Sequence, residues 1–235
     1  MKFTTTTLLA SRKTHLLCVL TAMMALGTSN IAHAGGVALG STRLIYPQGT
    51  KQVNMTVSNS DNEQSFLIQS WVSTADGKKT GDFVVTPPLF VLKPAKDNVL
   101  RVMYTGPELP KDKETLFYLN SKAIPAMDKS KIQGNALQIA TQSVIKLFVR
   151  PDNLPMNSAD APASLKCQLS AGKLNVINPT PYYITLVNFS VGGEKLTNTM
   201  VPPQGNAQLN ISGNGPVSFQ TMNDFGALTQ KQTCK

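Results

Sequence analysis

Histidine is almost missing from this 235-residue chain. The two histidines, His15 and His33, both lie near the N-terminus, inside a segment that the sequence predicts to be removed. The remaining chain therefore lacks the residue needed for a serine–histidine triad, a cysteine–histidine pair or a histidine-based metal site. We expect neither catalysis of these kinds nor a bound metal or cofactor.

Long apolar runs are also missing. A membrane-spanning helix needs about 20 apolar residues, whereas the longest candidate covers only residues 16–26. This run follows a basic start and precedes Ala32-His33-Ala34, which fits the small-x-small rule for signal cleavage. A membrane anchor is the alternative, but the run is too short. The sequence predicts a cleaved signal peptide over residues 1–34, and an exported, soluble chain that begins at Gly35 and does not insert into a membrane.

Cysteine is scarce, with three residues in the whole chain. Cys18 lies in the predicted signal peptide, which leaves Cys167 and Cys234. An even count in an oxidising compartment predicts one disulfide, with two free buried thiols as the alternative. Closing a loop of this size would contribute about 4 kcal/mol through the entropy of the unfolded chain.

Acidic residues are fewer than basic ones. Of the 22 basic residues, three lie in the predicted signal peptide, so the remaining 19 exceed the 13 acidic residues by six. A positive balance raises the question of nucleic acid or anionic lipid as a partner. The longest basic run is only Lys78-Lys79, however, and no aromatic residues alternate with the lysines. We expect a solvated basic surface and no nucleic-acid binding.

Short apolar runs, separated by polar or Gly/Pro turns, are what the chain does contain. Such spacing without a long helical period is typical of all-β proteins, and about seven strands in the first half suit an immunoglobulin-like sandwich. The proline-rich stretch PDNLPMNSADAP then indicates a linker. We predict an N-terminal immunoglobulin-like domain over residues 35–151, a linker over 152–162 and a C-terminal β-sandwich domain over 163–235. The runs expected to be strands are 37–46, 53–59, 66–72, 99–104, 116–124, 137–149, 164–169, 173–177, 182–191, 207–211, 217–222 and 229–234.

The stretch ALQIATQSVIKLFVRP, residues 136–151, has two halves. Residues 137–143 alternate in polarity, which predicts a strand with one apolar face. Residues 144–149 are nearly continuously apolar, which predicts a strand covered on both faces. Lys146 interrupts this second half, and a buried cation requires a partner or a function.

Short matches to the motifs of serine β-lactamases offer an enzyme interpretation. The chain contains Ser60-Asp61-Asn62, Lys79-Thr80-Gly81 and two S-x-x-K patterns. That chemistry needs S-x-x-K at the start of a helix, whereas residues three apart on a strand point to opposite faces. The order of the motifs is also wrong, so we interpret these matches as coincidental and expect no enzyme.

Segments spread over the whole mature chain match one protein family. They are GVALGSTRLIYPQGTKQVNMTVSN, TPPLFVLKP, LPKDKETLFYLNSKAIP, LQIATQSVIKLFVRP, NPTPYYITL and NDFGAL. The third segment carries the signature L-P-x-D-K-E-T-L-x-Y-x-N with a closing I-P, although Ser121 stands where the family usually has an apolar residue. On these residues the chain resembles the periplasmic pilus (fimbrial) chaperones of Gram-negative bacteria, whose use of strand addition is well known.

The resemblance implies a two-domain, L- or boomerang-shaped protein that donates a β-strand to incomplete pilus subunits. Leu137, Ile139 and Thr141 would fill pockets of the subunit, with Thr141 smaller than the residue that relatives often have. By the same resemblance, Arg43 and Lys146 bind the C-terminal carboxylate of the subunit. Partners would be pilus subunits, including an adhesin, and an outer-membrane usher, and the location would be the periplasm.

The resemblance also implies a charged cluster of Glu114, Arg150 and Asp224 that holds the angle between the domains. It makes a cis proline plausible in Thr86-Pro87-Pro88. The short connection between Pro125 and Leu137 is similar to the short-loop branch of the family. The competing interpretation is a structural pilus subunit or two-domain adhesin, which would have an incomplete sandwich and an N-terminal donor extension.

Overall fold

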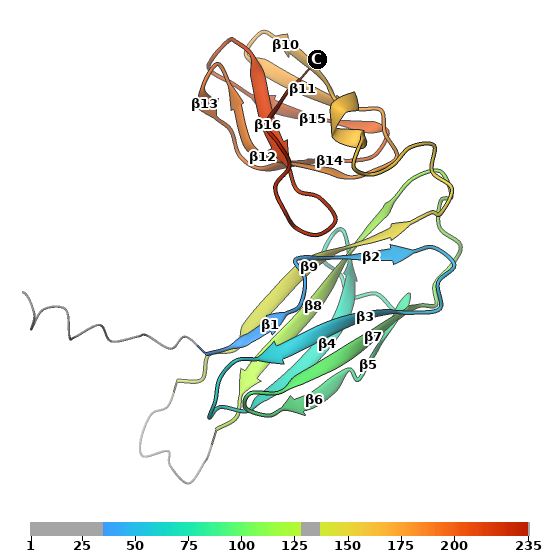
Figure 1. Ribbon diagram of the computed structural model, residues 1–235, viewed down its shortest axis with the longest axis vertical. Coiled ribbons are helices and arrows are strands. Elements are labelled where there is room, and N and C mark those ends of the chain that lie inside the picture. The colour runs from blue at the N-terminus through green and yellow to red at the C-terminus, as the bar shows by residue number, and fades with distance from the viewer. Residues whose placement is uncertain (1–34, 128–136, 235) are drawn as a thin grey trace, which may run out of the picture. The chain divides into compact units, whose positions relative to one another are not determined.

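The computed structural model describes residues 35–127 and 137–234, and these fold into two β-sandwiches (Figure 1). The predicted signal peptide and most of the predicted short loop after Pro125 lie outside the described residues. Within the described ranges, no helix is both long and apolar enough to cross a membrane. Within these same ranges, one short 3₁₀ helix covers Ala161–Ser164.

The first sandwich consists of a four-stranded sheet packed on a five-stranded sheet. The strand order is β1-β3-β7-β5 in the smaller sheet and β2-β9-β8-β4-β6 in the larger one. The strands are β1 (Val37–Leu39), β2 (Arg43–Pro47), β3 (Val53–Asn59), β4 (Phe66–Thr74), β5 (Phe83–Thr86), β6 (Leu89–Leu92), β7 (Asp97–Tyr104), β8 (Thr115–Pro125) and β9 (Thr141–Arg150).

The first strand region changes sheets part of the way along. The sequence predicts one strand over residues 37–46, but β1 pairs with β3 in the smaller sheet and β2 pairs with β9 in the larger one. Between them lie Gly40, Ser41 and Thr42, and the Ser41 hydroxyl donates to the carbonyl of Arg43 at 2.8 Å. This switch places the start of β2 beside the middle of β9.

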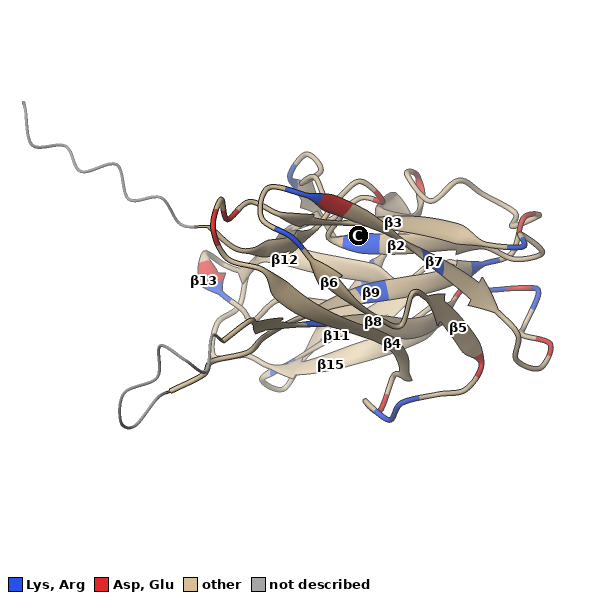
Figure 2. Cartoon of the chain, turned by 90° about the horizontal axis from the view of Figure 1, so that it is seen from below, with Lys and Arg blue, Asp and Glu red and all other residues tan. Residues whose placement is uncertain are grey.

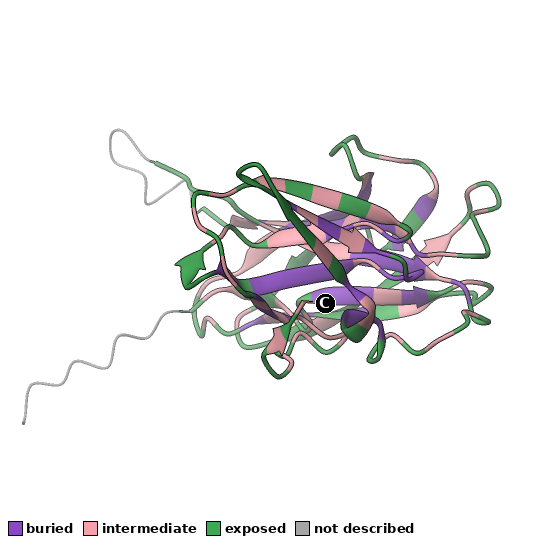
Figure 3. Cartoon of the chain, turned by 90° about the horizontal axis from the view of Figure 1, so that it is seen from above, coloured by how far each residue is buried: buried purple, intermediate pink, exposed green. Residues whose placement is uncertain are grey.

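The core of the first sandwich comes from side chains that alternate along the strands. In β3, Met55 and Val57 are buried while Asn54 and Thr56 are exposed. Aromatic rings pack edge to face around Phe83, whose centroid lies 4.9 Å from that of Phe117. Figure 3 shows buried residues along the strands and exposed ones mostly in the connections. This alternation is the pattern that the sequence predicted.

The second sandwich is smaller. Its two sheets have the orders β10-β11-β15 and β13-β12-β16-β17, with β14 paired to β12. The strands are β10 (Lys166–Ser170), β11 (Lys173–Asn178), β12 (Ile184–Val191), β13 (Glu194–Lys195), β14 (Thr199–Val201), β15 (Gly205–Asn210), β16 (Val217–Thr221) and β17 (Gln232–Thr233). The predicted disulfide is present, with a Cys167–Cys234 sulfur–sulfur distance of 2.08 Å, and it ties β10 to the residue after β17.

Several sequence expectations need adjustment. Strands β5 and β6 were not predicted, because their short runs flank the Thr86-Pro87 peptide bond, which is cis as the resemblance suggested. Ser121 is buried and bonded to the Ser70 hydroxyl at 3.3 Å, which satisfies the unusual polar residue.

Figure 2 shows basic and acidic residues interspersed along strands and loops.

Candidate functional site

The inner face of β9 belongs to the first sandwich. Ile145, Leu147 and Val149 all pack in its core, and the last two are almost fully buried. Val144, on the other face, is 52% exposed, so the prediction that residues 144–149 are covered on both faces is wrong at this residue. The covered part of β9 begins only one residue later.

From Lys146 onward, the outer face of β9 contacts the second sandwich. Lys146 Nζ donates to the hydroxyl of Thr185 at 3.3 Å, and the ring of Phe148 lies 5.6 Å from that of Tyr183, centroid to centroid. Arg150, two residues further on, reaches a carboxylate of the second sandwich. The continuously apolar half of the stretch is therefore explained by contact with two different sandwiches rather than by one core.

Arg150 is at the centre of a closed ion-pair cluster. Its Nε donates to Glu114 at 2.7 Å, and its two terminal nitrogens donate to the Asp224 carboxylate at 2.7 and 2.8 Å. Glu114 also accepts the backbone N–H of Tyr183 at 2.8 Å, and Asp224 accepts the hydroxyl of Ser158 at 2.9 Å. The structure thus brings together the three charged residues singled out in the sequence and adds two partners that the sequence did not reveal.

Burial and pairing set the protonation of this cluster. Glu114 is only 3% exposed, and desolvation raises its pKa although Arg150 and the Tyr183 N–H act in the opposite direction. The hydrogen bonds from Arg150 lower the pKa of Asp224, against the effect of burial. Burial by itself would lower the pKa of Arg150, but bonds and charges from Asp224 and Glu114 raise it above its ordinary value. Arg150 is therefore firmly charged, and all three of its nitrogens donate to carboxylates.

Arg43 lies on the same face of the sheet, next to Lys146. The two residues are register partners in the parallel pairing of β2 with β9. Arg43 is 7% exposed, donates from Nη1 to the carbonyl of Met222 at 3.1 Å, and has its guanidinium 6.0 Å from the ring centre of Phe148. Its Nε is buried without a hydrogen-bond partner. In the part of the chain that the structure describes, neither cation has a carboxylate within ion-pair distance.

The pKa values of both cations are lowered. Desolvation lowers the pKa of Arg43, although the more distant charges of Asp224 and Glu114 partly offset it. Desolvation also lowers the pKa of Lys146, and the adjacent positive charge of Arg43 lowers it further. A buried arginine and a partly buried lysine, side by side and bonded only to neutral oxygens, form a site that favours a carboxylate or another anion.

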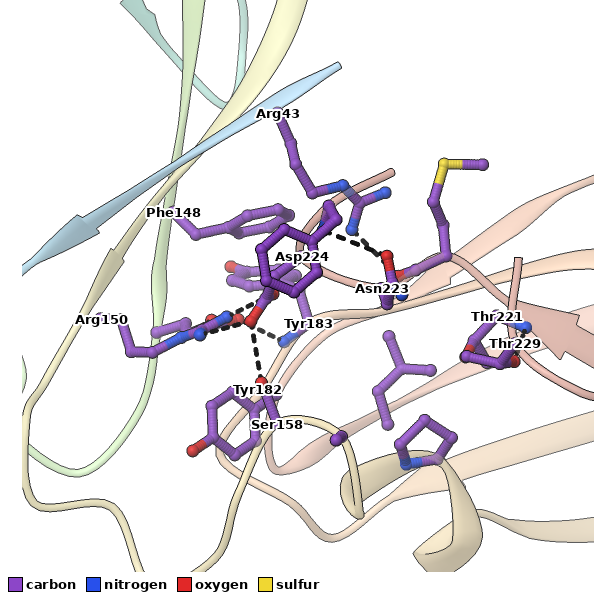
Figure 4. Close-up of a pocket in the computed structure, with 16 residues that line it drawn as sticks. Arg43, Phe148, Arg150, Ser158, Tyr182, Tyr183, Thr221, Asn223, Asp224 and Thr229 are labelled. Atoms are coloured by element: carbon purple, nitrogen blue, oxygen red, sulfur yellow. Dashed lines mark hydrogen bonds and ion pairs between the residues drawn. The ribbon is translucent and has the colours of Figure 1, made fainter. Parts of the chain in front are cut away.

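Two cavities meet at Arg43. One has a volume of about 480 Å³ and is lined by Lys146, Thr185 and Tyr118 among others. The other has a volume of about 160 Å³ and extends toward the ion-pair cluster (Figure 4). In Figure 4, Arg43 reaches from β2 toward the backbone at Asn223, and Arg150 reaches toward Asp224. The larger cavity gives access to both unpaired cations, so it is the candidate binding site.

The open edge of β9 leads to this site. On one side, β8 pairs with β9 from Thr141 to Val149. On the other side, β2 pairs only with residues 146–150, so among the described residues the edge of 141–145 has no partner. An unpaired edge offers N–H and C=O groups to an added strand. This unpaired edge ends at Ile145, directly before the register pair of Arg43 and Lys146.

The predicted donor strand is not a strand throughout. β9 begins at Thr141, and residues 137–140 lie outside any strand, with Leu137 85% and Ile139 66% exposed. The physical reason is that the neighbouring strand β8 ends at Pro125, which has no N–H to continue the ladder. The Gln138 side chain bonds to the carbonyl of Pro125 at 2.7 Å instead. Leu137 and Ile139 are thus apolar, exposed and next to an open edge.

Sequence reasoning missed the oxygens that hold the two cations. The Thr185 hydroxyl and the Met222 carbonyl come from the second sandwich, and no motif in the sequence pairs them with Lys146 or Arg43. Ser158 was placed in a linker, yet it bonds to the cluster. For Met222 the sequence gives an indirect signal, because this residue directly precedes the segment NDFGAL, which carries Asp224 of the predicted charged cluster.

Comparison with known proteins gives consistent matches over both sandwiches. The sequence family described as "Pili and flagellar-assembly chaperone, PapD N-terminal domain" matches residues 36–155, and "Pili assembly chaperone PapD, C-terminal domain" matches residues 160–233. The chaperone protein FocC of Escherichia coli is 49% identical over 200 residues, which cover 83% of this chain and 88% of that protein. The probable fimbrial chaperone ElfD of E. coli K12 is 47% identical over 207 residues, covering 87% and 88%.

Solved structures agree with these matches. The periplasmic chaperone SfaE has a TM-score of 0.75 and 44% identity, with 85% of this chain and 99% of that chain covered. A complex of the Salmonella enterica SafA pilin with the SafB chaperone gives a TM-score of 0.77 and 34% identity, with 84% and 95% covered.

Proposed function

The chain belongs to the PapD-type family of pilus-assembly chaperones, and we propose that it captures pilus subunits by lending them the open edge of β9. Its relatives are named as chaperones, one of them as a probable fimbrial chaperone, so the chain is a pilus-assembly chaperone and not a pilus subunit, the alternative raised by the sequence.

The main support for this function is that the open edge of β9 and the two cations without a carboxylate partner lie next to each other. The unpaired edge of β9 ends at residue 145, and the two cations without a carboxylate partner stand at the next register position. A strand added to this edge can extend no further, because β2 occupies the edge from Arg43 onward. A chain that ends there presents its terminal carboxylate to Arg43, which can form paired hydrogen bonds, and to Lys146, a compact point charge.

The position of the clamp also sets the direction of the added strand. The clamp lies at the C-terminal end of the open edge, and it binds a C-terminus. The last strand of the subunit must therefore run parallel to β9, and anchoring its end fixes the register of every pair before it. Leu137, Ile139 and Thr141 then meet defined pockets of the subunit. Full burial of a large apolar side chain of this kind contributes about 1.5–3 kcal/mol.

The cluster of Glu114, Arg150 and Asp224 has a supporting role in this proposal. It joins β9 and the residue before β8 to the second sandwich, which supplies Thr185 and the Met222 carbonyl to the two clamp cations. By fixing the contact between the two sandwiches, the cluster keeps Arg43 and Lys146 in position relative to these oxygens. No catalytic group, metal or cofactor is required.

The wider context follows the family. We propose that residues 1–34 are removed before Gly35 and that the mature chain works in the periplasm with domains at 35–151 and 163–235, joined by the linker 152–162. It would pass its subunits, including an adhesin, to an outer-membrane usher. The pilin complex among the similar structures supports a pilin as the partner, and the usher follows from the family resemblance.

Co-expression with candidate pilus subunits tests the clamp. Arg43→Ala and Lys146→Ala should each lower the amount of co-purified subunit at least tenfold, since truncating one partner of a buried charge pair costs roughly 2–5 kcal/mol. The matched controls are Arg101→Ala and Lys166→Ala, which remove exposed cations from β7 and β10. Undiminished capture by both clamp variants would overturn the proposal.

A second arm of the same experiment tests the donated side chains. Ile139→Ser should lower capture without changing the thermal stability of the free chaperone, because Ile139 is 66% exposed there. Val84→Ser, at a residue of similar chemistry that is 43% exposed on β5, serves as the control. Equal capture by the two variants would show that residues 137–141 are not donated.

A further inference from the structure

The turn after β16 has a fixed backbone. The Asn223 side-chain oxygen accepts the N–H groups of Phe225 at 3.1 Å and Ala227 at 2.9 Å. The backbone of Asn223 is bonded to Ala227 and Gly226, and Met222 forms a β-bridge with Leu228. Gly226 has a φ of +80°, a conformation that glycine adopts at little cost. The turn therefore presents its side chains in one defined orientation.

The same turn packs against the first sandwich. A Cβ atom on Gly226 would collide with the hydroxyl oxygen of Thr42, so the backbone of the turn is in direct contact with the residue that precedes β2. At the start of the turn, the Met222 carbonyl accepts the hydrogen bond from Arg43. The turn is thus fixed against the point where β2 begins and the open edge of β9 ends.

Phe225 projects from this rigid turn into solvent. It is 91% exposed, and Leu228 in the same segment is 52% exposed. Phe225 nevertheless lines the 160 Å³ cavity together with Arg43, which is 7% exposed and has an Nε without a hydrogen-bond partner. A single exposed aromatic residue is ordinary. Here it stands on a fixed backbone beside a buried donor that lacks its acceptor.

We infer that Phe225 is a selectivity residue, which packs against a side chain near the C-terminus of the captured subunit. This inference rests on the proposed function, because that function brings the end of the subunit to Arg43. An added strand on the open edge of β9 ends beside Thr42, on which the turn is seated. The aromatic ring then adds apolar contact next to the carboxylate clamp, and the clamp alone cannot distinguish one C-terminal residue from another.

The test uses the full mature chain and a defined set of probes. The probes are fluorescein-labelled peptides of 12 residues with alternating valine and threonine, in which each of the last three positions is in turn Ala, Leu or Phe. Every peptide is made with a free C-terminal carboxylate and as the C-terminal amide. Binding is measured by fluorescence anisotropy for the unchanged chain, for Phe225→Ser and for the conservative variant Phe225→Tyr.

The expected result has two separable parts. The unchanged chain should bind free acids more tightly than amides and should prefer Leu or Phe over Ala at one position by about fivefold, the size of one aromatic–apolar contact. Phe225→Ser should reduce that preference to less than about twofold but keep the preference for acids. Phe225→Tyr should keep both. The control Leu169→Ser, at a 41% exposed residue on the β10 edge, should change neither.

Each failure has a distinct meaning. If the unchanged chain bound free acids and amides equally well, the proposed function would be wrong. A normal preference for acids together with unchanged side-chain selectivity in Phe225→Ser would overturn only the role of Phe225. If Phe225→Ser instead altered the sedimentation coefficient of the free chain while leaving peptide selectivity intact, the ring would contact a second copy of the chain, and the inference would again be wrong.

Discussion

Arg150 and Arg43 lie on neighbouring strands and on the same face of one sheet, but their surroundings differ. Arg150 is bonded to two carboxylates, with N–O distances of 2.7 Å to each. Arg43 is bonded to one backbone carbonyl and lies beside Lys146, another cation. The first arrangement is complete within the chain, whereas the second has bonding capacity left for an anion from outside. Two arginines on paired strands therefore differ in whether their bonding capacity is used within the chain.

The comparison predicts opposite responses to removing the charge. Breaking the closed cluster leaves a buried carboxylate without its partner, and such changes cost about 3–5 kcal/mol. Arg150→Met should therefore lower the free energy of unfolding by roughly that amount in urea denaturation. Arg101→Met, which removes an exposed arginine from β7, should change it by less than about 0.5 kcal/mol. Similar stabilities for the two variants would show that the cluster does not stabilise the junction.

Removing a clamp cation should have a much smaller effect on folding. Lys146→Met deletes a charge that is desolvated and repelled by Arg43, and it loses one bond to a neutral hydroxyl. The free energy of unfolding should stay the same or rise by up to about 1 kcal/mol, while subunit capture is lost. Destabilisation as large as that of Arg150→Met would contradict the distinction between the two sites.

Acid should weaken the closed cluster through Asp224. The pKa of Asp224 is lowered in the folded chain, mainly by the hydrogen bonds from Arg150. The folded state therefore holds fewer protons at this group, so its stabilising contribution is complete above the ordinary pKa of about 3.8 and is lost as the pH falls through the lowered value. Asp224→Asn should flatten the acid side of the stability profile, as measured by thermal unfolding between pH 2 and pH 5 (a range of roughly one to two units around that pKa). An unchanged slope would exclude Asp224 as its source.

Alkali should affect the clamp in the opposite direction. The folded chain lowers the pKa of Lys146, so between that value and the ordinary 10.5 the unfolded chain holds the extra proton. Stability then rises with pH relative to Lys146→Met, and the rise is complete above the ordinary pKa. The difference between the two chains in thermal midpoint should be small, since Lys146 is partly exposed. A difference that does not change between pH 8 and pH 11 (about the range in which lysines titrate) would show that neither burial nor Arg43 lowers the pKa of Lys146 in the folded chain.

The sequence predicted the all-β class, the two sandwiches and the disulfide, because alternation, turn residues and cysteine count are local properties. Family resemblance identified Arg43, Lys146 and the three charged residues. Local pattern was less reliable where pairing depends on neighbours. β9 starts four residues later than its alternation suggested, since β8 ends at Pro125, and the first predicted strand is divided between two sheets.

Only the tertiary structure decided which cations are paired. In the sequence, Lys146 and Arg150 are equivalent basic residues on one face of a strand, four positions apart. Their difference comes from the second sandwich, which brings Asp224 to Arg150 but only a hydroxyl to Lys146. The seating of Phe225 beside Arg43 has the same origin. These contacts join residues 39, 74 and 179 positions apart, so they are set by folding and no short-range pattern records them.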